Sequence, residues 1–73
     1  MRDQARELMA TVFRLQPDDI EDSAVLGSLP GWDSLGHMRL VLAIEAALAR
    51  TLEPHEVVSV RSLDDVATLL QKK

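Results

Sequence analysis

The sequence predicts an all-α fold, a small four-helix bundle with a long first loop and a short third helix. Ala, Leu, Glu, Arg and Met, which are good helix formers, are abundant, whereas aromatic residues are rare. Apolar residues recur with the spacing of one helix face, and β-branched residues nowhere alternate with polar ones as in a half-buried strand. The chain has 73 residues, so we expect residues 1–73 to form a single domain.

The first helix is expected from Arg2 to Leu15. Its apolar stripe consists of Ala5, Leu8, Met9, Val12 and Phe13. Pro17 should end the helix, because the residue before a proline is disfavoured in the α conformation.

A long loop, 16–33, follows this helix. A loop of this length in a small domain is usually functional or packed by its own side chains. We therefore expect Ile20, Val25 and Leu26 to dock onto the helices.

The second helix is expected from Ser34 to about Arg50. Asp33 and Ser34 are both residue types that cap helix N-termini, and Pro30-Gly31 interrupts the chain just before them. No strong helix breaker follows in this segment, so the second helix should be the longest.

Two shorter helices complete the expected bundle. The third covers about Glu53–Ser59, with Pro54 in its first turn, where proline is tolerated. The fourth covers about Ser62–Gln71, and Ser62 and Asp65 have the spacing of a capping box.

The second helix carries two apolar stripes. One is an ordinary core face made of Leu40, Val41, Ile44 and Leu48. The other lies more than a third of a turn away and consists of Leu35, Met38 and Leu42. Three short helices cannot cover every side of this helix, so the second stripe is a candidate contact surface. Periodicity alone leaves open the alternative that the long loop covers it as further core.

Charge and composition exclude several classes of protein. The formal net charge of −4 is unsuited to binding nucleic acid, and no run of apolar residues is long enough to span a membrane. The chain has no cysteine, so neither a disulfide nor a thiolate-metal site supports the fold. The N-terminal segment is not a signal peptide, and we expect a cytoplasmic monomer.

Around Gly31-Trp32-Asp33-Ser34-Leu35 the sequence resembles the acyl carrier protein family. The Asp-Ser-Leu triplet at the start of the second helix is the family's signature. The resemblance extends to Leu48 and fits the whole chain in length, helix order, long first loop and Pro54 before the third helix. It implies a carrier protein and not an enzyme.

The resemblance implies that Ser34 is the attachment point of a covalent 4'-phosphopantetheine arm. A phosphopantetheinyl transferase would move the arm from coenzyme A to the serine hydroxyl, and the thiol of the arm would carry acyl or aminoacyl groups as thioesters. Asp33 would contact basic groups, or the metal site, of that transferase. A helix N-terminus suits the chemistry, because its unpaired N–H groups and partial positive charge favour a phosphate.

The resemblance also implies contact surfaces for the enzymes that load and transfer acyl groups. The implied partner-binding positions are Leu35, Met38, Arg39, Leu42 and Glu45. The core face of the second helix, with Val57, Val58 and Leu63, would line a pocket for the acyl chain. The best-known carriers of fatty acid synthesis are more acidic along the second helix. The pattern here looks more like carriers that serve polyketide, nonribosomal or related specialised pathways.

The alternative hypothesis is a helical protein-interaction module that carries no arm. In that interpretation Ser34 is only a helix N-cap, and the Leu35, Met38 and Leu42 stripe binds a partner helix. A catalytic role for His37 as a base is disfavoured, because no acid partner or oxyanion donor accompanies it. Trp32 is expected to anchor the loop, and guiding a partner is the alternative role for it.

Overall fold

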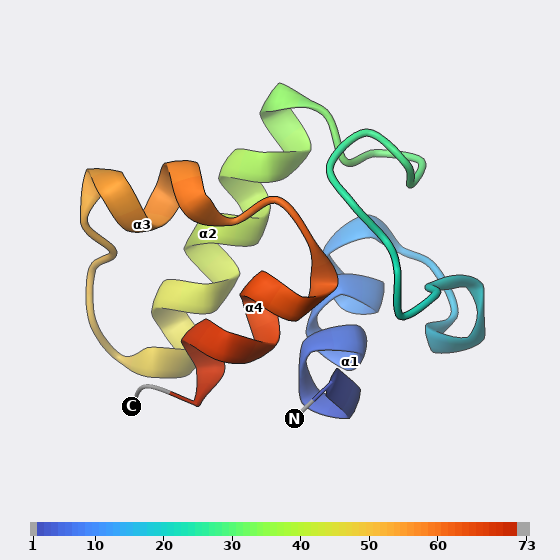
Figure 1. Ribbon diagram of the computed structural model, residues 1–73, viewed down its shortest axis with the longest axis horizontal. Helices are drawn as coiled ribbons and strands as arrows, with labels where there is room; N and C mark the ends of the chain where they lie inside the picture. Colours follow the sequence, from blue (N-terminus) through green and yellow to red (C-terminus); the bar gives the residue numbers. More distant parts are fainter. Residues whose placement is uncertain (1, 72–73) are drawn as a thin grey trace.

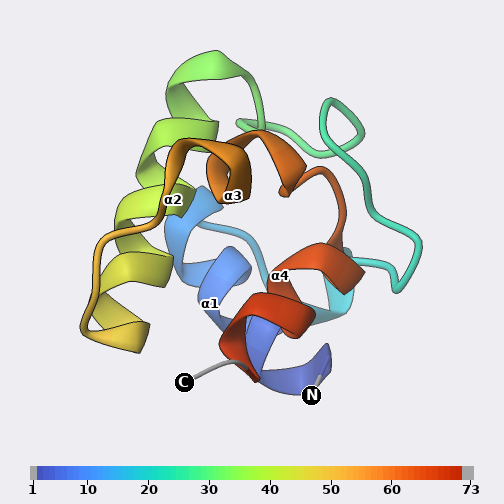
Figure 2. The ribbon, with the colours of Figure 1, turned by 60° about the vertical axis from the view of Figure 1, so that its left-hand side comes forward.

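Four α-helices and one short 3-10 turn make up the fold of the computed structural model, which describes residues 2–71. The elements are α1 (Arg2–Phe13), the 3-10 turn η1 (Pro17–Asp19), α2 (Ser34–Leu48), α3 (Pro54–Ser59) and α4 (Leu63–Leu70). α1 packs against α2 and α4, and α2 also contacts α4. α3 lies near α2 in both views (Figures 1 and 2). The predicted all-α fold, its helix order and its long first loop are confirmed. None of the helices within residues 2–71 has the length and apolar character needed to cross a membrane.

Two of the helices end earlier than the sequence predicts. α1 ends at Phe13 and α2 at Leu48, and in each case a residue in the left-handed conformation follows closely. These residues are Arg14, with φ of 57°, and Ala49, with φ of 59°. At the end of α1 the Leu15 N–H donates to the Ala10 carbonyl at 2.9 Å, the long closing bond of a Schellman motif. Neither site has the glycine that usually marks such an ending.

The two short helices begin with side-chain caps. Pro54 is the first residue of α3, as predicted, and the preceding Glu53 N–H donates to the Glu56 carboxylate at 3.0 Å. Ser62 caps α4 by accepting from the Asp65 N–H at 3.1 Å. The predicted capping box is modified, because the Asp65 carboxylate accepts from the N–H of Arg61 and not from that of Ser62.

An ion pair joins the end of α2 to the start of α3. Both terminal nitrogens of Arg50 donate to the Glu56 carboxylate at 3.0 Å. These bonds, together with the backbone N–H of Glu53, lower the pKa of the Glu56 carboxyl from 4.5 to about 2.

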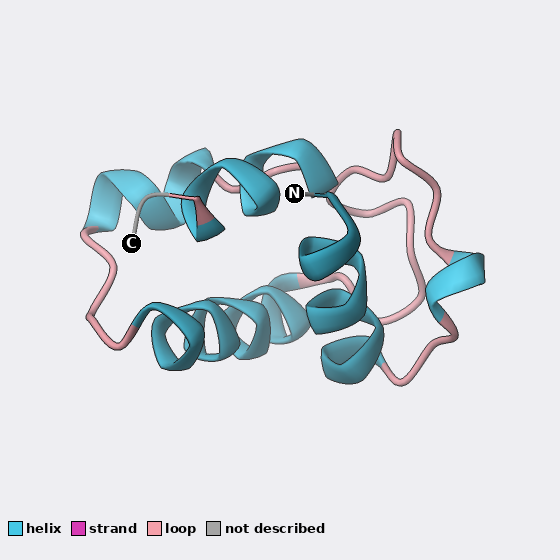
Figure 3. Cartoon of the chain, turned by 90° about the horizontal axis from the view of Figure 1, so that it is seen from below, coloured by secondary structure: helices cyan, strands magenta, loops and turns pink. Residues whose placement is uncertain are grey.

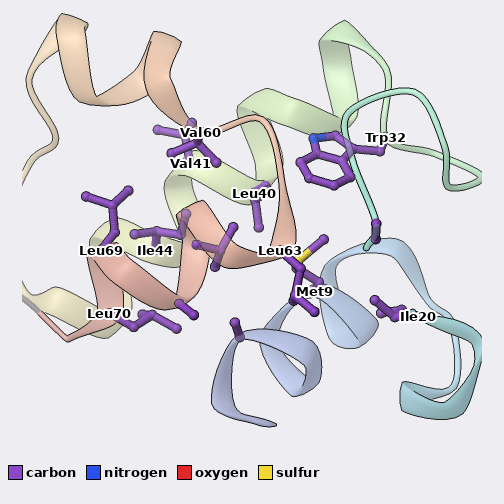
Figure 4. Close-up of a cluster of buried hydrophobic side chains, with 14 of the residues drawn as sticks. Met9, Ile20, Trp32, Leu40, Val41, Ile44, Val60, Leu63, Leu69 and Leu70 are labelled. Carbon is purple, nitrogen blue, oxygen red and sulfur yellow. The ribbon is translucent and has the colours of Figure 1, made fainter. Parts of the chain in front are cut away.

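The core lies where α1, α2 and α4 meet (Figure 4). Five side chains are completely or almost completely buried there: Met9, Leu40, Ile44, Leu63 and Val66. The predicted core face of α2 is thereby confirmed. Burying a side chain of this size stabilises the fold by roughly 1.5–3 kcal/mol relative to leaving it exposed, so these contacts supply the main driving force.

The long loop is held to the rest of the domain near its start and in its middle. Ile20 is buried, as predicted. Further along, the loop runs beside the α3–α4 connection (Figure 2). There Leu26 donates its N–H to the Arg61 carbonyl at 2.7 Å, and Leu63 donates to the Ala24 carbonyl at 3.0 Å.

The prediction that Val25 and Leu26 dock onto the helices is wrong. Their side chains are 48% and 44% exposed. The backbone of this stretch forms bonds to the α3–α4 connection, with an isolated antiparallel bridge between Val25 and Ser62. It is this backbone pairing that fixes the loop, and the two residues remain exposed.

Candidate functional site

Ser34 is the first residue of α2, and its side chain is exposed to solvent. α2 begins at an outer end of the molecule, where the long loop turns into the helix (Figure 1). Asp33 is the N-cap, and its carboxylate accepts from the Gly36 N–H at 2.9 Å. The interpretation of Ser34 as a simple N-cap is therefore wrong. Within residues 2–71, no hydrogen bond engages the Ser34 hydroxyl, so it is open to a reactant.

A glycine pair holds the loop tightly against this first turn. Gly36 is buried, and a Cβ atom there would collide with the carbonyl oxygen of Gly31 and lie 2.8 Å from its carbonyl carbon. Gly31 itself has φ of 88°, a conformation that L side chains rarely adopt. α1 lies beside α2 (Figure 3). The end of α1 closes the same contact, since a side-chain carbon of Phe13 would be 3.2 Å from that Cβ. The start of α2 is fixed by backbone packed directly on backbone.

Trp32 and His37 form a second brace next to Ser34. The indole is 1% exposed, and its Nε1–H donates to Nδ1 of His37 at 3.1 Å. An indole can only donate, so Nδ1 carries no proton and Nε2–H donates to the Val57 carbonyl, also at 3.1 Å. The expectation that Trp32 anchors the loop is confirmed. Both nitrogens of His37 are occupied by structural bonds, which agrees with its expected lack of a catalytic role.

The second apolar stripe of α2 lies on the surface. Leu35, Met38 and Leu42 are 63%, 57% and 62% exposed. The alternative that the long loop covers them as further core is thereby excluded. These three residues, called the α2 stripe below, begin next to Ser34 and run along one side of the helix.

Two charged residues border the α2 stripe and differ in their surroundings. Arg39 is exposed. Glu45 is half-buried, and its carboxylate accepts from the Leu52 N–H at 2.8 Å, which ties the α2–α3 connection to the helix. Glu45 therefore has a structural role, whatever it contributes to partner contact.

An open groove of about 560 Å³ lies between the long loop, α2 and α3. Its walls are formed by Val25, Leu26, His37, Val57, Val58, Val60, Arg61 and Ser62. The prediction of Val57 and Val58 as pocket residues agrees with this lining. The prediction for Leu63 is wrong, because this residue is completely buried in the core. The core face of α2 is likewise filled by side chains, so the groove is a surface feature.

The sequence alone indicated Ser34 and Asp33 but not the contacts that hold them. In the sequence, Gly36 is only a residue of low helix propensity. The Trp32–His37–Val57 connection has no sequence signal, because its second bond joins residues 20 positions apart in the chain.

Comparison with known proteins identifies the family. The family model described as phosphopantetheine attachment site matches residues 3–70, which is nearly the whole chain. No curated protein matches the sequence. Domains of this family carry a covalent 4'-phosphopantetheine group and act as carriers that do not catalyse reactions themselves. The chain belongs to this phosphopantetheine-binding family, that of the acyl carrier proteins.

Proposed function

We propose that Ser34 is the attachment residue, and that the protein tethers acyl or aminoacyl groups and presents them to partner enzymes. The observation that carries the proposal is the exposed Ser34 hydroxyl at the start of α2, with the capping role taken by Asp33. A serine needed for the cap would lose its bond on modification. Here the hydroxyl can be esterified without disturbing the helix.

The local electrostatics support a phosphate at this position. The first N–H groups of a helix have no carbonyl partner within the helix, and the helix dipole places a partial positive charge there. Asp33 satisfies the Gly36 N–H, while the N–H groups of Ser34 and Leu35 precede the first helical bond. A phosphodiester on Ser34 would lie next to these donors.

Attachment is a substitution at phosphorus. The Ser34 oxygen bonds to the phosphate that bears pantetheine in coenzyme A, the bond from that phosphate to the nucleotide breaks, and the serine proton passes to a base of the transferase. When attached, the group supplies a terminal thiol that carries the acyl cargo as a thioester. The rigid start of α2, braced by Gly36 and Trp32, holds the attachment point in place.

The α2 stripe is proposed as the docking surface for the transferase and for enzymes that load and unload the cargo. Exposed apolar residues at helical spacing form a patch that a partner can bury. Arg39 and Glu45 border it, and Asp33 lies at its Ser34 end. The groove lined by Val57 and Val58 is proposed to shelter an apolar cargo, since most of the side chains that form its walls are apolar. The single-domain organisation and the cytoplasmic location remain predictions from the sequence.

The experiment is phosphopantetheine loading measured by intact mass. The purified protein is incubated with coenzyme A and a transferase of broad specificity. The wild type should gain one phosphopantetheine group, and Ser34→Ala should gain none. Ser23→Ala is the matched control, because Ser23 is also exposed but lies in the long loop and not at the start of a helix, and this variant should be loaded like the wild type.

Ser34→Ala should also remain folded, since Asp33 and not Ser34 caps α2. An unchanged thermal transition shows that lost loading is not lost folding. A wild-type protein that stays unmodified beside a loaded positive control would refute the proposal and favour the alternative of an interaction module without an arm.

A further inference from the structure

The arginines of this chain differ in whether a carboxylate neutralises them. Within residues 2–71, Arg2 pairs with Asp64, Arg6 with Asp3 and Asp22, and Arg50 with Glu56. The Arg61 side chain donates to the Val58 carbonyl. In the same part of the chain, neither Arg14 nor Arg39 has an ion-pair partner.

These two arginines line the same pocket. It has a volume of about 280 Å³ and lies between the end of α1 and the first turns of α2. Val12 and Phe13 form its apolar wall, and Gly31 and Gly36 complete it. The formal net charge of the protein is −4, yet two arginines without carboxylate partners line this one pocket.

The pocket adjoins the α2 stripe. Arg39 is one turn from both Leu35 and Leu42, so it projects within about 60° of these two residues of the stripe around the helix axis. Arg14 approaches from α1 and has a left-handed backbone, which is unfavourable for any residue with a Cβ. Apolar contact area and positive charge therefore form one continuous surface.

We propose that this surface binds a partner protein whose contact face carries carboxylate side chains beside apolar ones. The α2 stripe would contact the apolar residues, and an Asp or Glu side chain would enter the pocket. Its methylene groups would pack on Val12 and Phe13, and its carboxylate would accept hydrogen bonds from Arg14 and Arg39. Guanidinium groups suit this role, because their planar donors match the two oxygens of a carboxylate.

The charge distribution gives the surface its selectivity. Elsewhere the acidic protein repels an acidic partner, whereas at this pocket the partner meets two arginines. Complementary charge of this kind sets the orientation of the bound partner and the rate of association, and salt weakens the attraction by screening it. The inference rests on the docking role proposed above for the α2 stripe and adds the charge of the partner.

The test uses two synthetic amphipathic helices with the same leucine face. The residues that flank this face are all Glu in one peptide and all Lys in the other. Each is titrated into the apo protein at low salt, and binding is followed through the backbone amide signals in nitrogen-proton correlation spectra. The Glu peptide should bind and shift the signals of Gly31, Gly36 and Leu42, and the Lys peptide should bind at least tenfold more weakly.

The variants are chosen so that the fold survives. Arg14→Gly removes a guanidinium and relieves the left-handed backbone, so its melting temperature should not fall. Arg39→Gln keeps the length of an exposed side chain. Each should weaken binding of the Glu peptide about tenfold, as expected for losing a charged hydrogen bond. Arg2→Gln is the matched control for net charge at the opposite end of α1 and should bind like the wild type.

Equal affinity for the two peptides, or full affinity in both pocket variants, would overturn the inference while leaving the α2 stripe as a docking surface. Failure of both peptides to bind would overturn the inference together with that docking role. Attachment of the arm to Ser34 is decided separately by the loading assay, which uses neither peptide.

Discussion

Replacing Gly36 with Ala should destabilise the protein, although Ala is the better helix former. Ala in place of Gly gains up to about 1 kcal/mol in a helix interior and less in the first turn. The new Cβ, however, would collide with the Gly31 carbonyl and lie 3.2 Å from Phe13. Because the Gly31 atoms belong to the backbone, the loop must move, and overpacking of this kind costs roughly 1–3 kcal/mol. The net expected loss is about 1–2 kcal/mol.

Thermal unfolding followed by circular dichroism measures this loss. A decrease of 1 kcal/mol lowers the melting temperature of a domain of this size by about 4–8 °C. The matched control is Ala46→Gly, an exposed position in the same helix, where Gly should be the worse residue by up to about 1 kcal/mol. A Gly36→Ala variant as stable as the wild type would refute the close packing of loop and helix beside Ser34.

Three further predictions concern caps and charges. Asp33→Asn should keep the cap of α2 and the melting temperature, whereas Asp33→Ala should lower the free energy of unfolding by about 1 kcal/mol. Slower phosphopantetheine loading of the Asn variant would reveal a role for the Asp33 charge in transferase contact, and an unchanged loading rate would exclude that role. Ala49→Gly should raise stability by about 1 kcal/mol in urea unfolding, because Ala49 has φ of 59°, and a loss would contradict the left-handed ending of α2. Arg50 lowers the pKa of Glu56 from 4.5 to about 2, so the contribution of this carboxylate to stability is present above pH 4.5 and is lost as the pH falls towards 2. The wild type should therefore lose more stability over that pH range than Glu56→Gln. Parallel curves of unfolding free energy against pH for the two proteins would contradict this.

The sequence predicted those parts of the structure that depend on local signals. Helical periodicity located the buried face of α2, and Pro54 and Ser62 marked the starts of the last two helices. The start of α2 at Ser34 was also correct, because Pro30 and Gly31 interrupt the chain and a capping residue follows.

Features that depend on contacts between distant segments could not be predicted in the same way. Val25 and Leu26 looked like core residues, but backbone pairing with the α3–α4 connection leaves their side chains exposed. The early ends of α1 and α2 had no glycine to mark them, because Arg14 and Ala49 take the left-handed conformation instead.

In the candidate site, too, local sequence signals could be read in advance, whereas contacts between distant residues could not. Asp33 and Ser34 could be identified from their residue types and position, although the sequence did not show which of them caps the helix. The hydrogen bonds of His37 with Trp32 and Val57, and the pocket shared by Arg14 and Arg39, exist only once the chain is folded.

Mapping the modification tests most directly whether the hydroxyl oxygen of Ser34 is the atom that carries the arm. Protein that has reacted with coenzyme A and transferase is digested, and the fragments are sequenced by tandem mass spectrometry. We expect the phosphopantetheine group on the peptide that contains Asp33-Ser34-Leu35, attached to Ser34. Finding the group on another serine, such as Ser28, would contradict it.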